Sequence, residues 1–223
     1  MTHVVHPYSH RLGIIRDWKS RWFGGKDQYV ENLRGDVIII EYLTKRLRGF
    51  YIASLDIERN EKTLRIIIKT SRPGMIIGRN GEGAVKLRAD IEKKAKQAKI
   101  TLPEKLKVDI EEVRYPEGNA AIVAYMIAEG LERRMPFRRV MKQTLEKVMA
   151  NRDVKGAKIS ISGRLAGAEM SRKEIVKRGA IPLQTFRADI DYAREKAYLP
   201  YGVIGIKVWI NKGEVFDKKK KAK

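Results

Sequence analysis

The spacing of apolar and polar residues changes along the first half of the chain, from a helical period to the alternation typical of strands. Apolar residues at helical spacing predict an amphipathic helix over residues 27–47, although Gly35 weakens its middle. Two alternating runs, 53–58 and 64–69, then flank a polar turn and predict a β-hairpin, because such alternation is typical of half-buried strands. The apolar stripe of the predicted helix consists of Tyr29, Leu33, Val37, Ile40 and Leu43.

A glycine-bearing segment follows the hairpin and separates two further helices. A short apolar stretch at 75–77 precedes Gly78-Arg79-Asn80-Gly81, and a helix with one apolar face covers about 84–98. A third alternating run at 106–111 predicts a strand. This order of elements indicates a compact α+β domain, which we place at residues 27–114.

The second half of the chain predicts a different arrangement. Two apolar-rich helices are expected in succession, the first over 119–134 and the second beginning at Pro136. Alternating runs then predict a mostly antiparallel sheet backed by the two helices. We therefore expect a C-terminal α/β domain at 115–216, with a basic arm at 1–26 and a disordered basic tail at 217–223. The predicted strands of this sheet are 157–162, 174–181, 187–192 and 203–210.

Composition narrows the possible partners. The chain has 223 residues, 48 Lys and Arg against 27 Asp and Glu, and a formal net charge of +21. Because 43% of the residues are hydrophobic, a folded protein is expected rather than a disordered polycation. Basic side chains bind polyanions by releasing condensed counterions, so a nucleic acid is the favoured partner. A basic protein of the membrane surface is the weaker alternative, since no amphipathic anchor stands apart from a core.

Several kinds of site are excluded or disfavoured. The absence of cysteine excludes disulfides, thiolate zinc sites, iron–sulfur clusters and a Cys nucleophile. His3, His6 and His10 lie in the basic arm without the spacing of a helical ligand pair, so we predict no metal and no cofactor. Asp189 and Asp191 are expected to be surface acids paired with nearby Arg187 and Arg194 rather than a catalytic dyad. No apolar run approaches the roughly 20 residues that span a bilayer.

The glycine-bearing segment has the chemistry of a clamp for single-stranded nucleic acid. Glycines at positions 78 and 81 would let the main chain approach a sugar-phosphate backbone. The N-terminus of the following helix would offer unpaired N–H groups to phosphate. The alternative is a tight turn between two helices, and we favour the clamp because of the surrounding elements and the net charge.

A second group of basic residues surrounds Pro136. On the helix that begins there, Arg138, Arg139 and Lys142 share the face opposite Phe137 and Met141. A solvated helix face is the usual interpretation of such a run, but like charges at this spacing destabilise a helix unless something offsets them. We therefore predict phosphate binding. The complete candidate group is Arg133, Arg134, Arg138, Arg139 and Lys142.

The loop after the first predicted strand of the C-terminal domain adds two more candidates. Arg164 and Arg172 flank a segment that carries Gly163 and Gly167. The two arginines are candidate contacts to RNA phosphate, whereas the two glycines have the alternative role of shaping a turn. Trp209 lies on an alternating strand and is expected in the core rather than as a platform for base stacking.

The first domain resembles a KH domain of the type II arrangement, because a Gly-x-x-Gly lies between its second and third helices. The resemblance covers about residues 27–113. It implies that Gly78, Arg79, Asn80 and Gly81 contact the nucleotide backbone. It also implies a groove lined by Ile76, Ile77 and the third strand.

The whole chain resembles the family of the third protein of the bacterial small ribosomal subunit. The strings that carry this resemblance are 131–134, 137–139, 162–169, 187–192 and 201–210. It implies a cytoplasmic, non-enzymatic protein that binds small-subunit rRNA in the head of the subunit. It further implies that Arg138, Arg139 and Lys142, with neighbouring ribosomal proteins, face the channel through which messenger RNA (mRNA) enters and assist its unwinding.

Two other functions are weighed against the ribosomal one. A free KH-type RNA-binding or RNA-processing factor is the first alternative, and it would be washed from ribosomal particles by high salt. A nucleic-acid lyase or nuclease is the second, because some relatives of this family are credited with cleaving abasic DNA. That chemistry needs a lysine of lowered pKa or a metal-binding acid cluster, and the sequence identifies neither.

Overall fold

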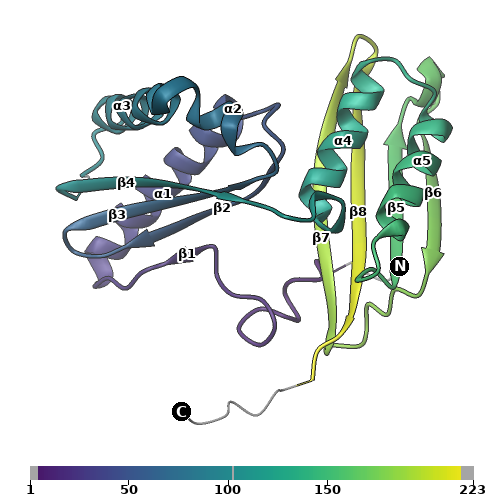
Figure 1. Cartoon of the computed structure of the whole chain (residues 1–223), viewed down its shortest axis with the longest axis horizontal. Helices are drawn as coiled ribbons and strands as arrows, with labels where there is room; N and C mark the ends of the chain where they lie inside the picture. Colours follow the sequence, from purple (N-terminus) through teal and green to yellow (C-terminus); the bar gives the residue numbers. More distant parts are fainter. Residues whose placement is uncertain (1–4, 102, 217–223) are drawn as a thin grey trace. The chain divides into compact units, whose positions relative to one another are not determined.

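A computed structural model describes residues 5–101 and 103–216, and the predicted tail at 217–223 lies outside them. The chain divides into two compact units. Residues 18–114 form the central unit. Residues 1–17 and 115–223 form the split unit, so named because its two segments are separated by the whole central unit in sequence (Figure 1).

The central unit has a four-stranded sheet with order β1-β2-β3-β4. Strands β2 and β3 form the predicted antiparallel hairpin, and β4 runs parallel to β3. The elements are β1 (Ser20–Arg21), α1 (Lys26–Arg46), β2 (Ile52–Arg59), β3 (Thr63–Thr70), α2 (Pro73–Ile77), the 3-10 turn η1 (Arg79–Gly81), α3 (Glu82–Gln97) and β4 (Lys105–Glu112).

The three helices of the central unit share one core with the inner face of the sheet. Ile57, Leu64 and Ile66 are fully buried on that face, as the alternating pattern predicts. Leu43 of α1 and Ile91 of α3 pack into the same cluster. This packing fixes the relative positions of the sheet and of the turn between α2 and α3.

The buried face of α1 differs from the predicted apolar stripe. Ile39 and Leu43 are buried, but Tyr29, Leu33 and Val37 are exposed, so the prediction is wrong for the first half of the helix. The residues buried there are Gly35 and Asp36.

A buried ion pair explains the difference. Arg59 Nη2 of β2 lies 2.8 Å from Asp36 Oδ1, and Trp22 Nε1 donates to Asp36 Oδ2 at 2.6 Å. A Cβ on Gly35 would lie 3.4 Å from Arg59 Nη2 and 3.0 Å from Ile100 Cγ2. Gly35 therefore leaves room chiefly for the Ile100 side chain, beside the guanidinium that reaches Asp36, and α1 continues through it without a break.

The split unit has an antiparallel sheet with order β6-β5-β8-β7, which confirms the predicted α+β class. Strand β7 continues well beyond the predicted end at 192, because Arg194 and Lys196 are exposed on an edge strand while Ala197 is buried on its other face. The elements are α4 (Ala120–Glu132), α5 (Phe137–Ala150), β5 (Gly156–Gly163), the 3-10 turn η3 (Leu165–Gly167), β6 (Arg172–Gly179), β7 (Ala188–Leu199) and β8 (Gly202–Glu214).

Each face of this sheet has its own apolar cluster. Helices α4 and α5 pack on one face, where Met141 and Ile159 are fully buried (Figure 1). Trp209 points to the opposite face and packs with Tyr192 and, from the N-terminal segment, Tyr8. The expectation that Trp209 belongs to a core is confirmed, since it is 6% exposed.

The N-terminal segment is tied to this second face by a buried arginine. The guanidinium of Arg11 is fully buried and donates to the carbonyls of Pro7, Leu183, Thr185 and Ala188 at 2.6–3.1 Å. Because carbonyl groups accept from four of its five N–H donors, burial of this cation is largely compensated by hydrogen bonds. The predicted arm at 1–26 is thus shared between the units, with residues up to 17 in the split unit.

Candidate nucleic-acid interface

The Gly-x-x-Gly segment forms a tight turn whose backbone requires its glycines. Gly78 has φ 72° and Gly81 has φ 81°, values that side chains disfavour, and Asn80 is also left-handed at φ 51°. Gly78 N–H donates to the carbonyl of Gly74 at 3.0 Å and so closes α2. Gly81 is the N-cap residue of α3, so the turn leads directly into the helix N-terminus.

A third glycine, which the sequence analysis missed, fixes the start of α3. A Cβ on Gly83 would lie 2.3 Å from the carbonyl oxygen of Ile76 and 2.8 Å from that of Ile77. Only glycine fits this approach of α3 to the C-terminus of α2. A glycine directly before the predicted helix, two residues after the Gly-x-x-Gly segment, is the sequence signal that could have identified it.

The side chains of the turn face solvent. Arg79 and Asn80 are exposed and have no hydrogen-bond or ion-pair partner in the described part of the chain. Ile77 is 37% exposed beside them, whereas Ile76 is 5% exposed and belongs to the core. The predicted groove lining is therefore wrong for Ile76. Val85, 70% exposed, is an additional apolar residue near this turn.

The most basic candidates of the split unit lie on α5 and the edge strand β6. We call Arg138, Arg139, Lys142 and Arg172 the α5–β6 surface. Arg138 and Arg172 come from different elements but share one carboxylate, that of Glu174. Their guanidinium carbons each lie 5.6 Å from the centroid of the Phe137 ring. Arg138, from the basic group around Pro136, and Arg172, from the group around the loop at 163–167, therefore lie on one surface.

The remaining two cations of the surface are free to bind an anion. Arg139 and Lys142 are exposed, and neither has an ion pair within residues 5–101 and 103–216. Met141 and Leu145, on the opposite side of α5, are buried in the core. The helix is therefore held by its apolar face, which offsets the repulsion between its neighbouring cations.

The other predicted arginines make local contacts. Arg133 forms an ion pair with Glu129 one turn earlier in α4. Arg134 ends the helix in a left-handed conformation with φ 59°. Arg164 donates to the carbonyls of Ala168 at 2.9 Å and Tyr201 at 3.4 Å, and so holds the loop that carries η3. Gly163 and Gly167 have φ values of 144° and 78°, as a turn requires.

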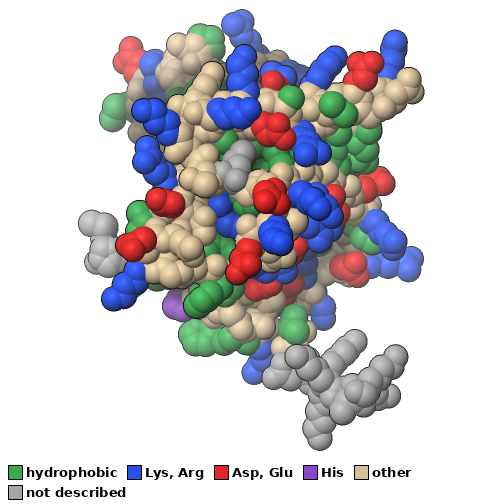
Figure 2. Space-filling model, turned by 90° about the vertical axis from the view of Figure 1, so that its left-hand side faces the viewer, with side chains coloured by type: hydrophobic (Ala, Val, Ile, Leu, Met, Phe, Trp, Pro, Cys, Tyr) green, Lys and Arg blue, Asp and Glu red, His purple; other side chains and the backbone are tan. Residues whose placement is uncertain are grey.

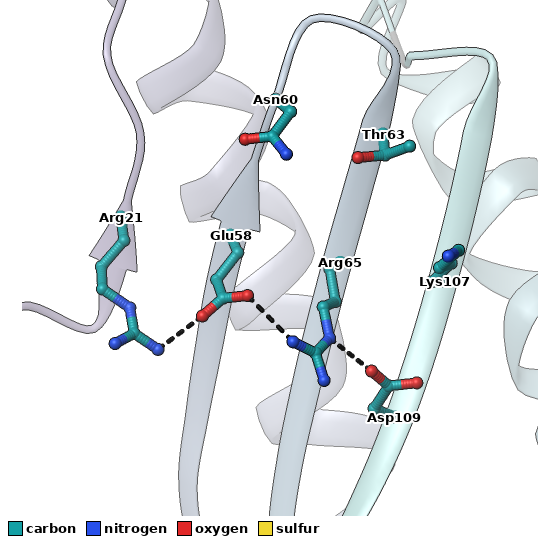
Figure 3. A pocket seen from close by; sticks show the side chains of 7 residues that line it. All are labelled: Arg21, Glu58, Asn60, Thr63, Arg65, Lys107 and Asp109. Carbon is teal, nitrogen blue, oxygen red and sulfur yellow. Dashed lines mark hydrogen bonds and ion pairs between the residues drawn. The ribbon is translucent and has the colours of Figure 1, made fainter.

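The outer face of the central sheet carries charges that neutralise one another. Glu58 lies between Arg21 and Arg65 with ion pairs of 2.6 and 3.2 Å, and Arg65 also pairs with Asp109 (Figure 3). The hydrogen bond from Arg65 to Asp109 raises the pKa of that guanidinium. This row crosses four strands and lines a shallow pocket, but its cations already have acidic partners. We therefore place the interface elsewhere.

The acids at 189 and 191 are not surface acids paired with neighbouring arginines. Asp191 is 5% exposed and accepts from Tyr8 Oη and from the N–H of Ala120, which begins α4. Asp189 pairs with Arg16 at 2.7 Å. The prediction failed because the partner segment, residues 5–17, is far away in sequence. Burial, and then Asp191, raise the pKa of Tyr8 well above its usual value.

Charge alone does not locate an interface on this protein. Figure 2 shows Lys and Arg side chains spread over the visible face with Asp and Glu among them.

Among the described residues, no three His, Asp or Glu side chains lie together as metal ligands, and His3 lies outside these residues. No helix in the described ranges is long and apolar enough to cross a membrane.

Comparison with known proteins confirms the resemblance seen in the sequence. The family model described as KH domain matches residues 38–118, and the model described as ribosomal protein S3, C-terminal domain, matches residues 127–210. A small ribosomal subunit protein uS3 from Shewanella denitrificans is 44% identical over 217 residues, covering 97% of this chain and 91% of the relative. The protein of the same name from Clostridium novyi is 43% identical over 220 residues, covering 99% and 96%.

Proposed function

The chain belongs to the uS3 family of small ribosomal subunit proteins, and on this basis we propose that it is a structural constituent of the small ribosomal subunit in the cytoplasm. In this role it binds small-subunit rRNA in the head of the subunit and contacts neighbouring ribosomal proteins. Its action is electrostatic and structural, with no chemical step.

Two surfaces are proposed to bind RNA. The turn at 78–81 contacts the sugar-phosphate backbone through its main chain and through Arg79 and Asn80. The α5–β6 surface contacts phosphates through side chains. Arg133, Arg134 and Arg164 are proposed as flanking contacts, since all three side chains are exposed, those of Arg133 and Arg164 despite their local hydrogen bonds.

The α5–β6 surface is proposed to face mRNA as it enters the subunit. The observation that carries this proposal is the pair Arg139 and Lys142, exposed cations that lack an ion pair in the described ranges and stand on a helix held firmly by its buried face. Cations of this kind attract phosphates of either strand without reading sequence. A strand that has opened and reached this surface is held there by its phosphates, which opposes re-pairing with the complementary strand and so assists unwinding.

Replacement of Arg138, Arg139 and Lys142 by alanine tests this assignment. We expect the variant to sediment with small subunits at about one copy each in high salt with magnesium, because assembly uses other contacts as well. Translation through structured messages should slow relative to translation of unstructured ones. Equal translation of both messages would contradict the assignment to mRNA, and recovery of the native chain only near the top of the gradient would favour the free RNA-binding factor.

A matched control removes the same charge from another helix. Lys93, Lys94 and Lys96 are exposed on α3 of the central unit. Their replacement by alanine should affect structured and unstructured messages equally. A selective loss on structured messages in this control would show that total charge, not the α5–β6 surface, determines unwinding.

A further inference from the structure

The α5–β6 surface contains a carboxylate at the point where its two arginines meet. Glu174 Oε1 lies 3.2 Å from Arg138 Nη2 and 3.5 Å from Arg172 Nη2. The Glu174 side chain is 25% exposed, against 69% for Arg138 and 50% for Arg172. The acid therefore lies beneath two guanidinium groups that remain open to solvent.

Glu174 occupies the edge of Arg138 that suits a phosphate. Arg138 Nε lies 3.4 Å from Glu174 Oε2, so Nε and Nη2 address the two carboxylate oxygens as a fork. Phosphate oxygens accept the same two-point contact. A phosphate that binds this edge of Arg138 must displace Glu174. A phosphate that binds the other N–H groups of Arg138 must instead approach the negative charge of the Glu174 carboxylate.

The Phe137 ring keeps both arginines in place while the carboxylate is exchanged. Arg138 and Arg172 lie at the same 5.6 Å distance from its centroid, within the range of a cation–π contact. A guanidinium released by Glu174 thus has another partner that does not compete for its N–H groups. Among the described residues, Arg139 and Lys142 have no such acidic partner, so the full charge of both side chains attracts phosphate.

We propose that Glu174 competes with RNA phosphate for Arg138 and Arg172, so that the α5–β6 surface holds a moving RNA strand and releases it readily. This inference rests on the proposed function, because it assumes that RNA phosphates meet this surface. Glu174 is a positioning residue in this scheme. It orients the two guanidinium groups in the absence of RNA and limits how tightly they bind phosphate.

The variant Glu174→Gln removes the charge and keeps the shape. The full-length protein is titrated against a fluorescent single-stranded oligonucleotide of uridines at several salt concentrations. We expect an affinity about three- to fivefold higher than native at low salt, the size of one exposed ion-pair contribution. The dependence of log affinity on log salt should steepen by about 0.7 for each additional phosphate that is neutralised.

Three further variants separate the effect of charge from the effects of shape and position. Glu174→Asp keeps the negative charge but is one methylene group shorter, so it should hold the two arginines less well and bind RNA with an affinity between those of the native chain and Glu174→Gln. Glu214→Gln breaks the Arg187–Glu214 pair of 2.5 Å in the same unit and removes the same charge away from α5. Its affinity should also stay close to native. Glu174→Thr removes the charge with a residue suited to strands and repeats the test if glutamine disturbs β6.

The outcomes distinguish this inference from the proposed function. An affinity of Glu174→Gln no higher than that of Glu214→Gln would overturn the competition. If the alanine variant at 138, 139 and 142 binds the oligonucleotide as well as the native chain does, the proposed RNA contact itself fails. If that variant binds more weakly while Glu174→Gln gains nothing, only the role of Glu174 fails.

Discussion

The turn between α2 and α3 and the α5–β6 surface, the two proposed RNA contacts, expose their cations to solvent by different means. The turn depends on its backbone, with positive φ at Gly78 and Gly81 and a close approach of α3 to α2 at Gly83. The α5–β6 surface depends on side chains, and its strength follows from which cations share Glu174. A backbone site is therefore sensitive to the space around its glycines, whereas a side-chain site is sensitive to charge and salt.

The largest effect is expected from Gly83→Ala, which tests whether the turn is a backbone site. The added methyl group would lie 2.3 Å from a main-chain oxygen, so α3 must shift or α2 must unwind. We expect a loss of about 1–3 kcal/mol in the free energy of unfolding of the central unit. Denaturant titration followed by Trp22, which contacts α1, measures this loss.

Gly74→Ala is the matched control for this substitution. Gly74 lies in α2, and a Cβ there would meet no atom within 4 Å. Its unfolding free energy should equal or slightly exceed the native value, because alanine favours helix over glycine. Equal destabilisation by both substitutions would refute the special role of Gly83.

A smaller effect is expected when the side chains of the turn are changed. In the chain that already carries alanine at 138, 139 and 142, Arg79→Asp with Asn80→Asp should weaken binding of single-stranded RNA about tenfold, or about 1.4 kcal/mol. The two carboxylates would repel phosphate without altering the glycines. Fluorescence anisotropy of a short oligonucleotide measures the affinity.

The fold should survive this double substitution, because both side chains are exposed. Asn80 has positive φ, a conformation that aspartate tolerates better than most residues. Unchanged affinity in a folded variant would contradict the contact between the turn and nucleic acid. A fall in thermal stability comparable with that of Gly83→Ala would instead show that these two side chains stabilise the fold.

The smallest effect is expected from the ionisation of Tyr8, which changes the stability of the split unit, the unit that carries the α5–β6 surface. Tyr8 donates to Asp191, and Asp191 also accepts from the first N–H of α4, so the phenol helps to anchor that helix. Because its pKa is raised in the folded state, the unfolded chain releases this proton first as the pH rises above 10. Stability is greatest well below pH 10 and declines as the pH rises through 10, by roughly 1 kcal/mol at pH 10.5.

Tyr8→Phe should remove this part of the alkaline dependence. The unfolding free energy of the variant should be lower than native at pH 8, since Asp191 loses a donor, but it should decline less between pH 9.5 and 10.5. Denaturant unfolding at each pH measures both quantities. Parallel pH curves for the two proteins would show that Tyr8 ionises at the same pH in the folded and unfolded chains.

Much of the fold was predictable because most of its elements follow a simple period. The hairpin, the third strand and the two helices of the C-terminal half were confirmed, since their apolar residues alternate or recur as burial requires. The buried face of the first half of α1 was not predictable. Asp36 is buried there through its pair with Arg59, and a pattern that counts apolar residues does not detect a buried acid.

The candidate interface was predictable in its residue types but not in its contacts. A run of cations after Pro136 indicates phosphate binding, yet nothing in the sequence places Glu174 between Arg138 and Arg172. That placement depends on how β6 pairs with β5 and how α5 packs beside it. The close approach at Gly83 likewise depends on the angle between two helices, which composition does not encode.

The location of residues 5–17 in the split unit has a consequence for biosynthesis. Arg11 leaves the translating ribosome early, but three of the four carbonyls that accept from it belong to residues 183–188. At about 5–20 residues per second the segment waits some ten to thirty seconds for its partners, while the whole central unit is made and can fold. A chain that stops before 183 would keep a complete central unit and an N-terminal segment with nowhere to dock. The split unit can therefore complete its folding only late in synthesis, once residues 183–188 have been made.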